Sequence, residues 1–158
     1  MSRSKYLLSS WLPVVLGMSL IFGASTDLMS SGRTSRYIGP FLRWFHPDIS
    51  EASVKKVQLV IRKCGHVTEY ALLALLLYRA VRRTLDRPTA NWCRHCAAWA
   101  LGLAFLYAAS DEWHQSFVPS RGSSFHDVLI DTAGAALGLV LLHGWHLWRQ
   151  ARELQRRD

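Results

Sequence analysis

The chain has 158 residues, of which 50% are hydrophobic and 19% are charged, and its formal net charge is +8. This hydrophobic content excludes a disordered chain, and a total of three cysteines excludes a disulfide-dense scaffold. The length fits a single domain, with either one soluble core or about four membrane crossings of roughly 20 residues each. Because averages hide segregation, the positions of the charges decide between these two classes.

Charged residues are rare in four windows of the sequence, at residues 7–26, 67–78, 97–110 and 128–148. The first and the fourth windows can cross a hydrocarbon core of roughly 30 Å, and the other two reach that length when flanking polar residues are included. A soluble helical bundle would need polar faces at a period of 3.6 residues, which the first and third windows lack. We therefore predict one all-α domain over residues 1–158, a polytopic four-helix transmembrane bundle with spans at about 7–26, 64–82, 95–115 and 127–148.

The segments around the first span add detail to this prediction. Arg3 and Lys5 precede an apolar run as in a signal peptide, but the run is long for one, so we expect an uncleaved helix. The long first extracytoplasmic loop mixes aromatic residues with arginines, which predicts a short interfacial helix that ends at Pro47. Ser50 can cap a further helix that continues into the second span, since only Gly65 interrupts it.

Tryptophan and basic residues indicate the orientation of the spans. Six of the seven Trp lie near the ends of predicted spans, at the headgroup level that indole rings prefer. The side that holds both termini carries eleven Lys and Arg residues, and the opposite side carries eight. The positive-inside rule then places both termini in the cytoplasm. The basic segments are expected to face anionic lipid, and no nucleic-acid partner is expected because aromatic residues are not interleaved with a basic patch.

Small residues predict the faces along which the spans pack. They recur at helical spacing at Ala97, Ala100, Ala104, Ala108, Gly134 and Gly138. Such stripes let helix backbones approach closely in a membrane. Ionisable residues that share or flank these faces should point into the bundle, and at membrane depth they are candidate functional residues.

These ionisable and polar residues form one predicted cluster. The ends of three predicted spans, namely the starts of the second and fourth and the end of the third, lie on the same outer side, so we expect a single membrane-embedded site there. Its predicted members are Lys63, His66, Glu69, Tyr70, Asp111, Glu112, His114, Gln115, Arg121, Asp127 and Asp131.

Two stretches of the chain resemble signatures of the VanZ-like family of bacterial membrane proteins. The first is RKCGHVTEYALL at residues 62–73, and the second is SDEWHQSFVPSRG at residues 110–122, followed by Asp127 and by DTAG at residues 131–134. The resemblance extends from about Trp11 to Gly138 and departs at Asp131, where the family usually carries Asn. It implies a small multi-span protein of the bacterial inner membrane with a role in the cell envelope. The family's namesake lowers susceptibility to the lipid-bearing glycopeptide antibiotic teicoplanin.

The predicted site leaves several functions open. It could bind a membrane lipid or a lipid-linked glycan, with Lys63, Arg121 and also Arg62 holding a phosphate. It could be an intramembrane hydrolase or transferase, with His66 or His114 as the general acid or base. The same histidines and carboxylates could hold a divalent metal, although no cofactor is required by the sequence. The cluster could also be a structural polar network that locks three helices together.

Two of the cysteines have a spacing typical of zinc sites, in Cys93-Arg94-His95-Cys96. No second pair of ligands follows in the sequence, and the predicted topology places this segment in the cytoplasm, where thiols stay reduced. We therefore expect two incidental thiols at the start of a helix.

Overall fold

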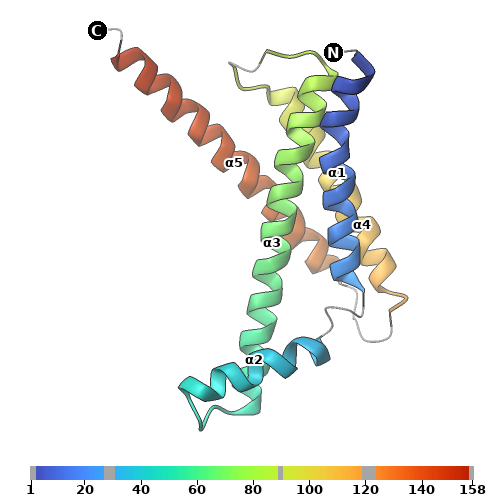
Figure 1. Ribbon diagram of the computed structural model, residues 1–158, viewed down its shortest axis with the longest axis vertical. Coiled ribbons are helices and arrows are strands. Elements are labelled where there is room, and N and C mark those ends of the chain that lie inside the picture. Colours follow the sequence, from blue (N-terminus) through green and yellow to red (C-terminus); the bar gives the residue numbers. More distant parts are fainter. Residues whose placement is uncertain (1–2, 27–30, 89–90, 119–123, 157–158) are drawn as a thin grey trace.

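The computed structural model is all-α, as predicted (Figure 1). It describes residues 3–26, 31–88, 91–118 and 124–156, with residues 31–37 by backbone alone. The described residues form five helices, α1 (Arg3–Ser25), α2 (Ser31–Phe45), α3 (Glu51–Thr84), α4 (Arg94–Gln115) and α5 (Phe125–Gln155). A helix lies at each of the four predicted spans, and α2 occupies the place predicted for the interfacial helix.

Helix α3 is the centre of the fold, since it contacts each of the other four helices and packs most extensively against α5. It begins where the sequence predicts, because the Ser50 side chain accepts a hydrogen bond from the Ser53 backbone N–H at 3.2 Å. The helix then continues through Gly65 for 34 residues, which corresponds to a length of about 50 Å. Its N-terminal part carries α2 and projects beyond the other helices (Figure 1).

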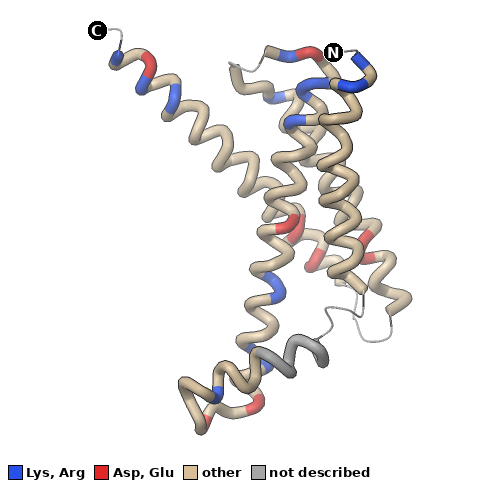
Figure 2. Tube along the Cα trace, viewed as in Figure 1, with Lys and Arg blue, Asp and Glu red and all other residues tan. Residues whose placement is uncertain are grey.

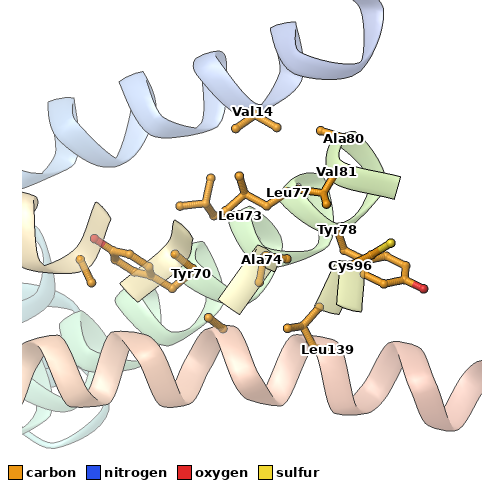
Figure 3. Packing of buried hydrophobic residues seen from close by; sticks show 14 of the residues in the cluster. Val14, Tyr70, Leu73, Ala74, Leu77, Tyr78, Ala80, Val81, Cys96 and Leu139 are labelled. Atoms are coloured by element: carbon orange, nitrogen blue, oxygen red, sulfur yellow. The ribbon is translucent and has the colours of Figure 1, made fainter. Parts of the chain in front are cut away.

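The apolar core lies between α1, α3, α4 and the first half of α5. Val14 of α1 faces Leu73 and Leu77 of α3, and all three side chains are buried (Figure 3). On α4, the residues that contact this core are small, and the side chains of Ala100, Ala104 and Ala108 are fully buried. The stripe of alanines predicted from the sequence is therefore the packing face of α4.

The contact between α3 and α5 depends on two glycines. A Cβ atom at Gly134 would lie 2.6 Å from the Val67 carbonyl oxygen, and one at Gly138 would lie 2.7 Å from the Ala71 carbonyl oxygen. The two helix backbones therefore approach too closely for any side chain at these positions, as expected of a small-xxx-small motif. Beyond Leu139 no further residue of α5 is buried, and its C-terminal half runs away from the other helices (Figure 1).

Two of the helices, α1 and α5, are long and apolar enough to cross a membrane. Much of their apolar surface faces outward: on α1, for example, 75% of Leu20 is exposed, and on α5, 65% of Val140 is exposed. Monomeric soluble proteins rarely expose contiguous apolar surface on this scale. The structure thus supports a membrane-associated helical protein.

Charged residues are segregated along the helices (Figure 2). Lys and Arg gather around the N-terminus and the connection between α3 and α4, and again near the end of α5. Acidic residues lie near the middle of α3, toward the opposite end of α4 and at the start of α5, while further Lys and Arg follow the N-terminal part of α3. The N-terminal start of α1 and the α3–α4 connection lie at the same end of the molecule, as an up-and-down arrangement of α1, α3 and α4 requires.

The start of α4 corrects one prediction. Cys93 and Cys96 form a disulfide, so the expectation of two incidental thiols is wrong. Cys93 is the N-cap of α4, and its sulfur accepts a hydrogen bond from the Cys96 backbone N–H at 3.2 Å. Cys64 is a free cysteine with an exposed side chain on α3. Spacing alone could not distinguish a disulfide from free thiols, because both are compatible with one helical turn.

Candidate functional site: a polar pocket between three helices

A polar pocket lies where α3 passes the end of α4 and the start of α5. Three helices contribute to its wall, as the predicted topology requires. The residues that line it are Arg62, Lys63, His66, Glu112, Gln115, Asp127, Ile130 and Asp131. Seven of these eight side chains are polar or charged, so the pocket is suited to a polar ligand and not to an apolar chain.

The basic side of the pocket comes from α3. The Lys63 ammonium lies 2.6 Å from Oδ1 of Asp127 on α5, and this ion pair joins the two helices. Arg62 is half-buried beside it. Among the residues that the structure describes, Arg62 makes no ion pair and donates no side-chain hydrogen bond. One guanidinium in the pocket wall is therefore available to an anion.

The acidic side of the pocket comes from α4 and α5. Asp131 is only 3% exposed and Glu112 only 7%. Glu112 accepts a hydrogen bond at 2.9 Å from the backbone N–H of Ser124, the N-cap residue of α5. A carboxylate at this place satisfies one of the free N–H groups at a helix start and complements the helix dipole. Glu112 therefore fixes the start of α5 against the end of α4.

A second network lies behind the pocket and connects α1 to α4. The Ser25 hydroxyl donates to Oδ2 of Asp111 at 2.7 Å, and the Gln115 side-chain amide donates to the same oxygen at 2.9 Å. Gln115 Nε2 also lies 3.3 Å from Ser25 Oγ. All three side chains are buried. Asp111 is thus held by partners on two helices, and Gln115 alone belongs both to this network and to the pocket wall.

The other predicted members lie next to the pocket without lining it. Glu69 Oε2 is 3.6 Å from Nδ1 of His66, one helical turn away on α3. Tyr70 is fully buried in the core, and its hydroxyl finds no hydrogen-bond partner among the described residues. The His114 ring packs against Phe22 of α1 at a centroid distance of 4.4 Å.

The structure therefore divides the predicted cluster. Six predicted residues line the pocket, namely Lys63, His66, Glu112, Gln115, Asp127 and Asp131, and four lie around it, namely Glu69, Tyr70, Asp111 and His114. Arg121 falls outside the described residues. The sequence analysis considered Arg62 only as an additional phosphate ligand, and it did not identify Ser25 as a member of the site.

A metal site receives no support from this arrangement. Within the described parts of the chain, no group of three or more His, Cys, Asp or Glu side chains could hold a metal ion. In the pocket wall the Lys63 ammonium forms an ion pair with the carboxylate of Asp127, and the backbone N–H of Ser124 donates a hydrogen bond to the carboxylate of Glu112. Two of the three carboxylates in the pocket wall, those of Asp127 and Glu112, are thus engaged with partners in the protein itself.

Comparison with known proteins agrees with the family resemblance of the two motifs. A family model described as VanZ/LLP1 matches residues 8–148. The chain belongs to the VanZ/LLP1 family. Searches of curated proteins and of solved structures give no match. The matched region includes every residue that lines the pocket of this VanZ/LLP1 protein.

Proposed function

We propose that this VanZ/LLP1 protein is a four-span protein of the bacterial inner membrane that binds the phosphate-bearing headgroup of a lipid or lipid-linked glycan. Its termini would be cytoplasmic and its pocket would open near the extracytoplasmic side. The outward apolar surfaces of α1 and α5, the helices at all four predicted spans and the count of basic residues support this arrangement. Charged side chains buried between spans are otherwise costly, which favours a functional role for them.

The observation that carries the binding proposal is the Arg62 side chain in the pocket wall. Lys63 beside it is already paired with Asp127, whereas Arg62 has no ion-pair partner among the described residues. A guanidinium can form two parallel hydrogen bonds with phosphate oxygens, and it keeps its charge when partly buried. The carboxylates on the opposite wall can accept hydrogen bonds from the hydroxyl groups of a sugar or glycerol headgroup. An anion flanked by hydroxyls therefore matches the two sides of the pocket.

Native mass spectrometry of the purified chain tests this proposal. The protein is extracted with its own lipids and is also titrated with a polyprenyl phosphate and with phosphatidylglycerol. We expect Arg62→Gln to weaken retention about tenfold or more, since a hydrogen bond to a charged group contributes roughly 1.5–3 kcal/mol. Arg79→Gln is the matched control, because Arg79 is an exposed arginine of the same helix outside the pocket. Equal retention by both variants would contradict the proposal.

A second candidate function is hydrolysis or transfer at the lipid phosphate. The specific observation in its favour is that His66 lines the pocket while Glu69 lies 3.6 Å from its Nδ1. A carboxylate next to an imidazole is the usual arrangement of a general acid or base. Release of phosphate or transfer products from the bound lipid, abolished by His66→Gln while the lipid is still retained, would favour this function over binding alone. If no lipid is retained and pocket variants only unfold, the cluster is a structural network.

A further inference from the structure

The second reactive feature of the chain is the disulfide at the start of α4, far from the polar pocket along that helix. Cys93 and Cys96 lie on the same helical turn, with a Cα–Cα distance of 5.2 Å. A crosslink between two residues of one helix joins no separate elements of the fold. Closing so short a loop also restricts the unfolded chain much less than closing a long one does. A role as a structural staple therefore explains this disulfide poorly.

The two sulfur atoms have unequal surroundings. Cys96 is fully buried in the core, whereas Cys93 is partly exposed. The Cys96 backbone N–H points at the Cys93 sulfur from 3.2 Å, and Cys93 stands at the N-terminus of a 22-residue helix. Both features stabilise a thiolate at Cys93 relative to a thiol. The exposed Arg94 adds a positive charge next to it.

The loop that carries Cys93 is held from behind by aromatic side chains. The Tyr78 hydroxyl accepts a hydrogen bond from the Cys93 backbone N–H at 3.1 Å, and Tyr78 stacks on Trp92 at a centroid distance of 4.8 Å. Trp92 in turn packs against His143 of α5 at 4.7 Å. Tyr78 and Cys96 lie side by side in the core (Figure 3). The backbone around the cysteines is thus supported whether or not their sulfur atoms are joined.

We infer that Cys93 and Cys96 are a redox-active pair that exchanges two electrons with an external dithiol, with Cys93 as the accessible sulfur and Cys96 as the resolving one. A thiolate of the dithiol attacks Sγ of Cys93, the Cys93–Cys96 bond breaks, and Cys96 leaves as a thiolate that takes up a proton. The second thiol of the dithiol loses its proton and attacks the first sulfur of the dithiol in the mixed disulfide, and Cys93 is released as a thiolate that takes up the second proton. Two electrons and two protons thereby pass from the dithiol to the pair. Cytosolic disulfides are usually of this transient kind, which agrees with the predicted orientation.

The test uses the full chain in detergent on a Cys64→Ser background, because Cys64 would otherwise react with the reagents. The protein is equilibrated with mixtures of reduced and oxidised dithiothreitol, the exchange is quenched with acid, and all free thiols, including the buried Cys96, are then alkylated in denaturant with a maleimide that adds mass. We expect one transition between no label and two labels per chain, with unchanged elution in size-exclusion chromatography. Thiol–disulfide exchange that occurs only when denaturant is present during the equilibration, or two thiols that never become oxidised, would overturn the inference.

Single variants separate the roles of the two cysteines. With oxidised glutathione, Cys96→Ser should accumulate one glutathione per chain at Cys93. Cys93→Ser should react at least about tenfold more slowly, because its remaining thiol is buried. Equal rates, or a faster reaction at Cys96, would refute the assignment. If either variant fails to fold, the rate at which the folded Cys64→Ser protein is reduced by dithiothreitol still decides whether the pair is redox-active, since a merely structural disulfide would resist reduction until the protein unfolds.

Discussion

The close approach of α3 and α5 makes the packing of this protein sensitive to a single added methyl group. In Gly134→Ala, the new Cβ would lie 2.6 Å from the Val67 carbonyl oxygen and 2.8 Å from the Val67 Cα. Ordinary contacts of a Cβ begin at 3.4 Å, so the backbones would have to separate by several tenths of an ångström. Overpacking of this kind costs about 1–3 kcal/mol. Gly138→Ala is expected to cost a similar amount, because its Cβ would lie 2.7 Å from the Ala71 carbonyl oxygen.

Gly144→Ala is the matched control, since no atom lies within 4 Å of a Cβ built at Gly144 on the same helix. All three substitutions raise helix propensity equally, so a difference between them reports on packing. The assay is thermal unfolding in detergent, followed by tryptophan fluorescence and by the fraction that remains monodisperse. We expect Gly134→Ala and Gly138→Ala to lower Tm by roughly 3–10 °C, and Gly144→Ala to leave Tm unchanged or to raise it.

The same variants carry information about the site, because Gly134 lies one helical turn from Asp131 in the pocket wall. A shift of α5 away from α3 moves Asp131 and the residues beside it relative to Arg62. Lipid retention should therefore fall in Gly134→Ala even where the protein stays folded. A Gly134→Ala protein with the Tm and lipid retention of Gly144→Ala would refute the packing argument.

The remaining predictions concern the polar contacts and the orientation. Ser25→Ala should destabilise the protein by about 1–3 kcal/mol, because it removes a hydrogen bond from the buried Asp111. The control Ser19→Ala, on the exposed face of α1, should have little effect on Tm, and equal Tm values for the two variants would argue against the network. The half-exposed pair of Lys63 and Asp127 should show a coupling of only about 0–1 kcal/mol in a double-mutant cycle, and a much larger value would mean that the pair is buried in the membrane. Reporter fusions should place the C-terminus in the cytoplasm and the α2–α3 connection outside, and a periplasmic C-terminus would reverse the topology.

Features that depend on periodicity were predictable from the sequence. Ser50 has the side chain and the position of an N-cap, and the small side chains at positions 100, 104 and 108 repeat at helical spacing. Each of these signals is local to one helix, because spacing determines which residues share a face. Combined with the order of the spans, the faces also predicted that three helices meet at one polar site.

Features that depend on the rotation of one helix about another were not predictable. Asp111 and Glu112 are adjacent in the sequence, yet Asp111 turns toward Ser25 of α1, whereas Glu112 turns into the pocket and toward α5. The angle between such neighbours is about 100° on a helix, so a small rotation decides which helix each one meets. His114 likewise meets Phe22, a contact that no spacing within α4 could indicate. The disulfide depends on oxidation, which the spacing of Cys93 and Cys96 alone does not determine.

Gln115 belongs both to the Ser25–Asp111 network and to the pocket wall, and this affects which ligands the pocket can bind. Its Nε2 has two hydrogens, and they are directed to Asp111 and Ser25 behind the pocket wall. The side-chain oxygen is therefore the group that Gln115 can offer to a ligand, and an amide oxygen only accepts hydrogen bonds. The polar groups that α4 and α5 present to the pocket are hydrogen-bond acceptors, while α3 contributes the donors Arg62 and Lys63. A ligand that has only hydrogen-bond acceptors at both ends could bind the α3 side of the pocket but not the opposite side. The pocket therefore favours a headgroup with acceptors, such as phosphate oxygens, at one end and donors, such as hydroxyl groups, at the other.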